Sequence, residues 1–180
     1  MLATRPFEIR PAAEADLAEI TAIYADAVLH GTASFEIEPP DQAKMASRRA
    51  AVLAAGLPYL VAADAGRVLG YAYASPYRPR PAYHWTVEDS IYVWPVSQRR
   101  GIGRALLALL VAETEAQGFR QMVAVIGDSA NAGSVGVHEA LGFSLVGVLK
   151  DVGYKHGRWL DSVIMQRALG PGAGTPPSGA

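Results

Sequence analysis

The stretch Gln98-Arg99-Arg100-Gly101-Ile102-Gly103-Arg104 decides how the rest of this chain is interpreted. It follows a segment with strand character, residues 86–93, and precedes an uninterrupted helical segment, residues 105–117. The first amides of a helix have no internal partner, and the helix dipole is positive at that end. Glycine lets the backbone approach a ligand closely, so the pattern predicts a phosphate or pyrophosphate site.

Two common phosphate motifs do not fit this stretch. The nucleotide P-loop requires Lys followed by Ser or Thr, which is missing, and the dinucleotide fingerprint requires a third glycine where Leu106 stands. The spacing matches Gln/Arg-x-x-Gly-x-Gly/Ala and so resembles the coenzyme A pyrophosphate loop of the GNAT acetyltransferase superfamily. The alternative is a tight turn whose arginines are solvated.

Composition limits the classes of function. The 180 residues fit a single domain, and a hydrophobic content of 51% is that of a globular chain. A net charge of -1 provides no basic field for nucleic acid or a membrane surface, so we expect neither partner. The chain has no cysteine, which excludes disulfides, thiolate metal sites and a cysteine nucleophile, and we expect no metal. The first ten residues lack a signal-peptide core, and no apolar run is long enough to span a bilayer, so a cytoplasmic location is expected.

The order of the predicted elements indicates an α/β fold with a mixed central sheet flanked by helices. Strands are predicted at residues 7–10, 59–63, 68–75, 86–93, 121–126, 143–150 and 161–167. Helices are predicted at residues 13–29, 41–56, 105–117 and 134–141, with Asp41 and Ser134 as N-caps. This order resembles the GNAT fold, with the coenzyme A loop between the fourth strand and the third helix. Residues 1–169 form the predicted domain. Residues 170–180 consist only of Gly, Pro, Ala, Thr and Ser and are predicted to be a disordered tail.

Glu88 is the candidate general base. Alternation along residues 86–93 places Val87 and Asp89 on a mostly apolar face and Glu88 on the opposite, polar face. An amine with a pKa near ~8–10 must lose a proton before it can attack a thioester, and a carboxylate can take that proton directly or through water. Backbone amides near residues 91–93 could stabilise the oxyanion. The alternative is a glutamate that faces solvent.

A second motif, residues 131–143, contains Asn131, Ser134 and His138. It resembles the GNAT segment that begins with a coenzyme-contacting Asn and ends in Leu-Gly-Phe/Tyr. His138 stands where many members have a tyrosine acid, and histidine is typical of the phosphinothricin acetyltransferase branch. Histidine can donate to a thiolate or position a substrate. The alternative is a helix-face histidine bonded to a core carbonyl.

Other stretches resemble the same branch: Tyr83-His84-Trp85-Thr86-Val87-Glu88, residues 115–127, and Gly153-Tyr154-Lys155-His156-Gly157. The resemblance implies an N-acetyltransferase that uses acetyl-CoA as co-substrate and acts on a small amino-acid analogue such as phosphinothricin or methionine sulfoximine or sulfone. It also implies a homodimer. The residues implied to bind the coenzyme are Ile91, Val93, Arg99, Arg100, Gly101, Ile102, Gly103, Arg104, Asn131 and Ser134.

The resemblance implies that the substrate pocket is formed by Phe35, Arg80 and Tyr83. Phosphinate, sulfoximine and carboxylate oxygens favour arginine and tyrosine partners. For Arg80 the alternative is an exposed loop charge, and this interpretation is preferred for Arg78. Two other functions stay open: an acetyltransferase for another amine, such as a peptide N-terminus, and a non-catalytic acyl-CoA sensor, which would not need Glu88.

Overall fold

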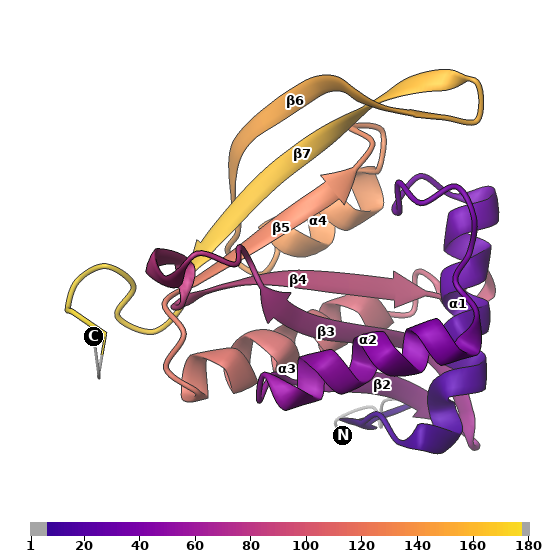
Figure 1. Ribbon diagram of the computed structural model, residues 1–180, viewed down its shortest axis with the longest axis horizontal. Coiled ribbons are helices and arrows are strands. Elements are labelled where there is room, and N and C mark those ends of the chain that lie inside the picture. Colours follow the sequence, from indigo (N-terminus) through magenta and orange to yellow (C-terminus); the bar gives the residue numbers. More distant parts are fainter. Residues whose placement is uncertain (1–6, 178–180) are drawn as a thin grey trace, which may run out of the picture.

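Within residues 7–177, which the computed structural model describes, seven strands form a mixed sheet in the order β1-β2-β3-β4-β5-β7-β6. The strands are β1 (Glu8–Pro11), β2 (Tyr59–Asp64), β3 (Arg67–Pro76), β4 (Thr86–Val93), β5 (Gln121–Gly127), β6 (Ser144–Lys155) and β7 (Arg158–Ala168). Figure 1 shows β2 to β4 in the lower half of the sheet and the long β6–β7 hairpin above them. Residues 1–6 and 178–180, parts of the predicted domain and tail, lie outside the described residues.

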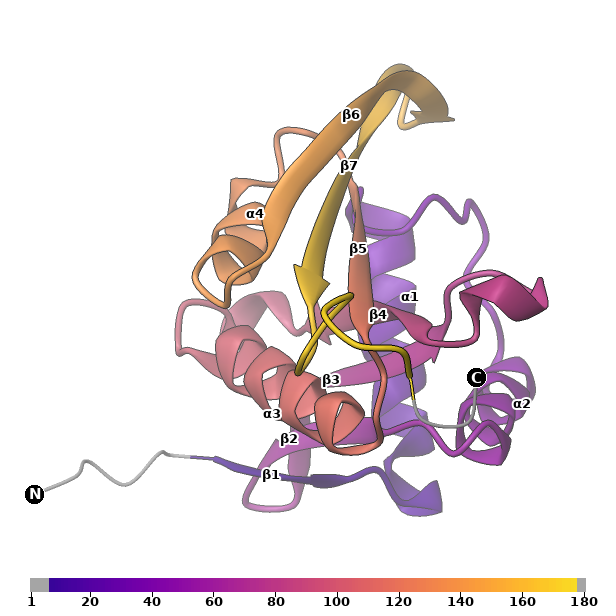
Figure 2. The same cartoon turned by 90° about the vertical axis from the view of Figure 1, so that its left-hand side faces the viewer.

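Helices cover both faces of the sheet. They are α1 (Leu17–His30), α2 (Gln42–Ala54), α3 (Ile102–Ala116) and α4 (Ala132–Glu139), with short 3-10 turns at Glu14–Asp16, Pro81–Tyr83 and Pro95–Ser97. Figure 2 shows α1 and α2 on one side of the sheet and α3 and α4 on the other. Among the described residues, no helix combines the length and the apolar character that crossing a membrane would require.

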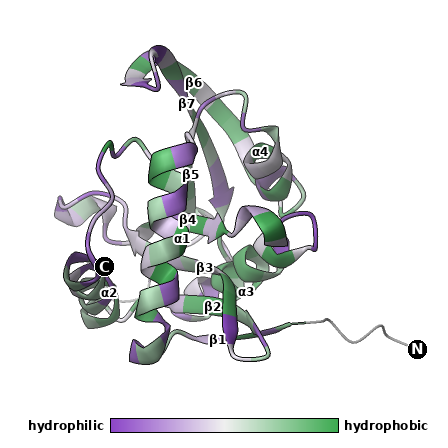
Figure 3. Cartoon of the chain, turned by 90° about the vertical axis from the view of Figure 1, so that its right-hand side faces the viewer, coloured by the Kyte–Doolittle hydropathy of each residue, from purple (hydrophilic) through white to green (hydrophobic). Residues whose placement is uncertain are grey.

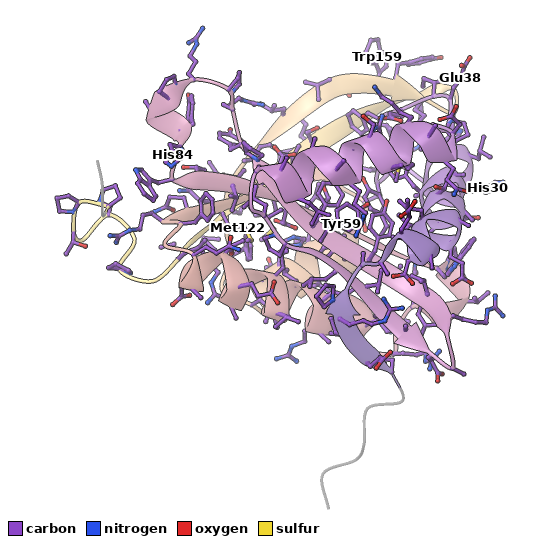
Figure 4. The ribbon with its side chains drawn as sticks, turned by 60° about the horizontal axis from the view of Figure 1, so that its bottom comes forward. His30, Glu38, Tyr59, His84, Met122 and Trp159 are labelled. Atoms are coloured by element: carbon purple, nitrogen blue, oxygen red, sulfur yellow. The ribbon has the colours of Figure 1, made fainter. Side chains whose placement is uncertain are left out.

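Apolar residues at helical spacing attach each helix to the sheet. On α1, Ile20, Ile23 and Val28 are buried, and on α3, Leu106 and Leu110 are fully buried. Figure 3 shows hydrophobic and hydrophilic colouring alternating along α1, as expected for a helix with one buried face. The side of the sheet under α1 and α2 is aromatic: the rings of Tyr59 and Tyr73 stack with centroids 5.0 Å apart. Figure 4 shows Tyr59 beneath α2.

The predicted α/β order of elements is confirmed, with corrections at three helix starts. Helix α1 begins at Leu17, four residues after the predicted start, because Glu14–Asp16 form a 3-10 turn. Helix α3 begins at Ile102, three residues before the predicted start, because Gly101 adopts a left-handed conformation (φ +79°) that turns the loop into the helix. The prediction that Ser134 caps α4 was wrong. Asn131 is the N-cap, and its side-chain oxygen accepts from the Ser134 amide at 3.2 Å, so the helix begins at Ala132.

The last described residues fold back onto the start of β5. Residues 170–175 form successive turns and bends, and Arg120 donates to the carbonyl oxygen of Pro176 at 3.0 Å and to the Thr175 hydroxyl at 3.3 Å. Arg120 reaches a third acceptor of this segment, the Gly172 carbonyl oxygen, and the disorder expected from the composition of residues 170–180 stays a prediction.

The sheet divides at the middle of β4. This strand pairs with β3 along its whole length, but it pairs with β5 only from Thr86 to Asp89, opposite Gln121–Ala124. Beyond that point β5 continues alongside β7. We call the point where β4 and β5 separate, after Asp89 and Ala124, the fork.

The outer end of the β6–β7 hairpin is attached to the loop between α1 and α2. Lys155 Nζ donates to the carbonyl oxygen of Ser34 at 2.7 Å, and His156 Nε2 lies 3.2 Å from the carbonyl oxygen of Gly31. Phe35 of the same loop lies against Gly127 and Gly153, where an added Cβ would overlap its ring. Two glycines therefore allow this loop to approach both β5 and β6.

Gly127→Ala is expected to lower the free energy of unfolding by about 1–3 kcal/mol, because the new Cβ would overlap the Thr32 carbonyl oxygen and the Phe35 ring. The matched control is Gly136→Ala on α4, where an added Cβ meets nothing within 4 Å. That change should be neutral or stabilise by up to about 1 kcal/mol. Urea denaturation of both variants measures the difference, and equal stabilities would contradict the close approach at Gly127.

Candidate active site

A cavity of about 570 Å³ opens between the end of β4, the start of α3 and α4. Ten of the residues that the sequence predicted for the site line it: Ile91, Val93, Arg99, Gly101, Ile102, Gly103, Arg104, Asn131, Ser134 and His138. The last turns of α1 and the loop after it, residues 23–33, form the opposite wall, which the sequence did not predict. The cavity passes the fork, so it contacts both faces of the divided sheet.

The backbone of β4 beyond the fork offers free amides. The Trp94 amide donates to the Leu69 carbonyl oxygen of β3 at 3.0 Å. Because successive amides of a strand point to opposite edges, the amides of Ile91 and Val93 point away from β3, toward the gap where β5 has separated. These donors match the predicted oxyanion site, and an extended ligand arm could pair with them as a strand would.

The glycine-rich loop presents the start of α3 to the cavity. The amides of Ile102, Gly103 and Arg104 occupy the first turn, where a helix leaves its N–H groups without internal partners. A Cβ on Gly103 would meet only a Val93 methyl at 3.8 Å, so the space over this amide is open. Arg100 is not among the residues that line the cavity, because its guanidinium lies 3.8 Å from the Asp64 carboxylate.

His138 makes two hydrogen bonds inside the protein. Its Nδ1 lies 2.7 Å from the Ser134 carbonyl oxygen, one turn earlier on α4, and its Nε2 lies 3.0 Å from Asp89 Oδ2 at the fork. The alternative interpretation of His138, a helix histidine bonded to a carbonyl, thus describes one of its two nitrogens. Burial alone would lower the pKa of His138, but Asp89 and the Ser134 carbonyl outweigh it and raise the pKa above its usual value.

Glu88 lies on the opposite face of β4 from Asp89. It stands across from Ser75 of β3, on the side of the sheet that carries Tyr73 and Tyr92. Burial raises the pKa of the Glu88 carboxyl, the positive charge of Arg78 opposes this effect, and the charge of Asp89 adds to it. A half-buried carboxylate with a raised pKa is suited to accept a proton near neutral pH.

The loop between β3 and β4 brings Arg78, which the sequence favoured as an exposed loop charge, near Glu88. Arg78 lies over the Tyr77 ring, 4.6 Å from its centroid, and its charge acts on Glu88. Arg80 is exposed, and Tyr83 packs edge-on against Tyr77 with centroids 5.6 Å apart. Phe35 lies at the outer side of the fork against Gly127. None of Phe35, Arg80 and Tyr83 lines the large cavity.

The main residue that sequence reasoning missed is Asp89. The strand alternation had placed this carboxylate on the apolar face, and a carboxylate in a core requires a partner. The sequence therefore contained a signal, although it did not identify His138 as the partner. Within residues 7–177 no cluster of three or more His, Asp or Glu side chains is arranged to hold a metal ion.

Comparison with known proteins agrees with this geometry. Residues 9–164 match the acetyltransferase (GNAT) domain family. A phosphinothricin N-acetyltransferase of Alcaligenes faecalis is 54% identical over 94% of this chain and 86% of its own length. An L-methionine sulfoximine/L-methionine sulfone acetyltransferase of Pseudomonas aeruginosa is 44% identical over 93% of this chain and 98% of its own. The crystal structure of a phosphinothricin acetyltransferase from Sinorhizobium meliloti with AcCoA superposes with a TM-score of 0.94, at 50% identity, and covers 97% of this chain and 95% of that one.

The start of α3 should control coenzyme A affinity. Gly103→Val is expected to weaken binding at least tenfold, because its side chain would fill the open space over the helix amides. Arg104→Ala should cost about 1–2 kcal/mol if its charge contacts a phosphate. Isothermal titration calorimetry with coenzyme A measures both, with Arg67→Ala as a control at an exposed arginine away from the cavity. Unchanged affinity in Gly103→Val would rule out this loop as the pyrophosphate site.

Proposed function

The chain belongs to the GNAT acetyltransferase family, and we propose that it transfers the acetyl group of acetyl-CoA to the amino group of a small amino-acid analogue. Phosphinothricin and methionine sulfoximine or sulfone are the proposed substrates, since relatives of 54% and 44% identity are named for them. Such a reaction would convert the amine of a toxic analogue into an amide, a role in resistance. A cytoplasmic location is part of the proposal, because acetyl-CoA is available there.

The observation that carries this proposal is the fork itself. It combines free amides at Ile91 and Val93, a helix start for the pyrophosphate, and a half-buried carboxylate, Glu88, at the same point. In the proposed reaction the coenzyme lies along β4 with its thioester at the fork. Asn131 and Ser134 of α4 border the arm of the coenzyme.

Glu88 acts as the base in this proposal. It takes a proton from the substrate ammonium, directly or through water, and the free amine attacks the thioester carbonyl. The amides that point into the gap stabilise the negative oxygen of the tetrahedral adduct. The charge of Arg78 acts on Glu88, and Arg80 and Tyr83 belong to the same loop, where an anionic substrate end would bind.

Glu88→Gln is expected to lower turnover about 10²–10⁴-fold while coenzyme affinity stays unchanged. The raised pKa of Glu88 means that its basic form is gained at a higher pH than for an ordinary glutamate, so wild-type turnover should rise with pH as Glu88 and the amine lose protons. High pH should restore part of the variant's rate, because solvent then supplies free amine. Acetyl-CoA consumption with phosphinothricin, methionine sulfoximine, methionine sulfone and a set of peptides is the assay.

The outcomes of that assay separate the alternatives. A variant with wild-type rate across the pH range would place the base elsewhere. Turnover with peptides alone would indicate an acetyltransferase for protein N-termini. Coenzyme binding without any turnover would indicate an acyl-CoA sensor.

We further propose that the protein forms a homodimer through the β6–β7 hairpin. No strand within the described residues pairs with the outer edge of β6. Six apolar side chains of this hairpin are more than half exposed: Leu145, Val146, Leu149, Val152, Tyr154 and Trp159. Apolar surface of this extent is typical of an interface. Figure 4 shows Trp159 at the outer end of the hairpin, away from α2.

Replacement of Leu149 by Lys and of Trp159 by Lys should convert a dimer into a monomer, because each change places a charge in the apolar contact. Sedimentation equilibrium at micromolar concentration measures the mass. Leu53→Lys on α2 is the control, since Leu53 is 44% exposed and lies on a different element. A wild-type protein of monomer mass would exclude the dimer.

A further inference from the structure

Lys155 is a buried lysine at the last position of β6. It is only 4% exposed, and its ammonium donates to the carbonyl oxygen of Ser34 at 2.7 Å. Burial lowers the pKa of Lys155, and the charge of Glu36 opposes that effect. Lysine is almost never buried to this extent without a partner, because its ammonium loses its hydration there. A methionine would fill the same space without that loss, so the N–H donor is the feature that distinguishes lysine at this position.

The residue that Lys155 binds belongs to the loop between α1 and α2. The hydroxyl of Ser34 lies 2.9 Å from the hydroxyl of Tyr24 on α1, and both groups are buried. Ser34 is therefore tied to α1 by its side chain and to β6 by its carbonyl oxygen. Figure 1 shows this loop reaching from the end of α1 toward the outer end of the β6–β7 hairpin. The contact of His156 with the Gly31 carbonyl oxygen is exposed, so the Lys155 bond is the buried link between the loop and the hairpin.

The same loop borders a second, smaller cavity at the fork. This cavity has a volume of about 50 Å³, and Ala33 borders both it and the large cavity. The rest of its border consists of residues of β4 and β5 and of α4 with its N-cap Asn131. Sheet and helix hydrogen bonds hold those backbones. The position of Ala33 depends instead on the contacts that hold its neighbour Ser34.

The small cavity is where the acyl group of the coenzyme would lie. In the proposed reaction the thioester is at the fork, which places its acyl end beside Ala33. A cavity of this size has room for one or two groups as large as a water molecule, such as the methyl and the oxygen of an acetyl group. A longer acyl chain would have to displace the loop. An apolar pocket of fixed shape distinguishes ligands that differ by one methylene by about 10–200-fold.

We propose that Lys155 is a positioning residue that sets the length of the acyl group the protein accepts. By holding the Ser34 carbonyl it keeps Ala33 against the small cavity, so that acetyl-CoA binds better than propionyl-CoA or butyryl-CoA. Lys155 lines neither the small nor the large cavity, so it acts through the loop and not by contact with the coenzyme. This inference rests on the proposed acetyl transfer and adds a determinant of its acyl donor.

The first test compares coenzymes of different acyl length in the absence of an amine. Isothermal titration calorimetry measures the affinities of coenzyme A, acetyl-CoA, propionyl-CoA and butyryl-CoA. The wild-type protein should prefer acetyl-CoA to butyryl-CoA by about tenfold or more. Lys155→Met keeps the length of the side chain and removes the donor, and it should lower this preference several-fold. Its affinity for coenzyme A should stay unchanged, because the pyrophosphate site lies at the start of α3.

The matched control is Lys150→Met on the same strand. The Lys150 side chain is 69% exposed and bonds to Asp161 at 2.8 Å, away from the loop. This variant should keep the wild-type preference for acetyl-CoA. A purely structural Lys155 would weaken all four ligands alike or none of them, and either result in Lys155→Met would overturn the proposal. A wild-type protein without a preference for acetyl-CoA would also overturn it.

The second test observes the loop itself. Amide hydrogen exchange followed by mass spectrometry reports local opening of residues 31–36. Exchange in this segment should become several-fold faster in Lys155→Met and should not change in Lys150→Met. Unchanged exchange in Lys155→Met would mean that other contacts hold the loop, and the proposal would be wrong.

The third test leaves Lys155 in place and therefore does not depend on the folding of its variant. Ala33→Gly removes the methyl group that borders the small cavity and should lower the preference for acetyl-CoA over propionyl-CoA several-fold. An unchanged ratio of the two affinities would overturn the proposal. Because all of these affinities are measured without an amine, they decide this inference even if the protein acetylates no amine and the proposed function fails. Acetylation of amines with equal affinity for all acyl lengths would leave the proposed function intact and exclude this inference.

Discussion

The separation of β4 from β5 after Asp89 is the constraint on which the site depends. A parallel pair that continued to Val93 would use the amides of Ile91 and Val93 in the sheet, and no donor would face the cavity. Unpaired backbone amides in a partly enclosed place cost about 1–3 kcal/mol each. The two strands stay in place despite this cost, because β4 is paired with β3 on its other edge and β5 is paired with β7. A ligand arm that lies in the gap would restore the missing hydrogen bonds.

The two halves of the sheet are kept in place by contacts on either side of the fork. On the side of α3 and α4, the bond between Asp89 and His138 joins β4 to α4. On the other side, Lys155 and His156 of the hairpin bind the carbonyl oxygens of the loop after α1, and Phe35 lies against two glycines. These contacts come from segments far apart in the sequence. They connect the wall of the cavity to the hairpin that carries the exposed apolar surface, so the proposed dimer interface and the cavity share one element.

The position of charges at the fork follows from strand geometry. Two adjacent carboxylates on a strand must face opposite sides of the sheet, and here Glu88 faces the side of α1 and α2 while Asp89 faces α4. Their environments differ accordingly. Glu88 is half-buried beside Arg78, whereas Asp89 is almost fully buried against an imidazole. The same pleat that separates the two sides of the sheet therefore gives two adjacent carboxylates different surroundings.

The sequence by itself determined the order of elements, the strand at residues 86–93, the glycine loop and the Asp41 cap, because these depend on local spacing and on backbone preferences. It also indicated the family, because the coenzyme loop and the segment from Asn131 to Phe143 are contiguous motifs. Only the tertiary structure decided the partner of Asp89, the cap at Asn131, the approach of Arg78 to Glu88 and the diversion of Arg100 to Asp64. Each of these joins side chains whose distance depends on the twist and pairing of strands or on loop conformation. Periodicity fixes which face a residue occupies, but not which residue of another element lies opposite to it.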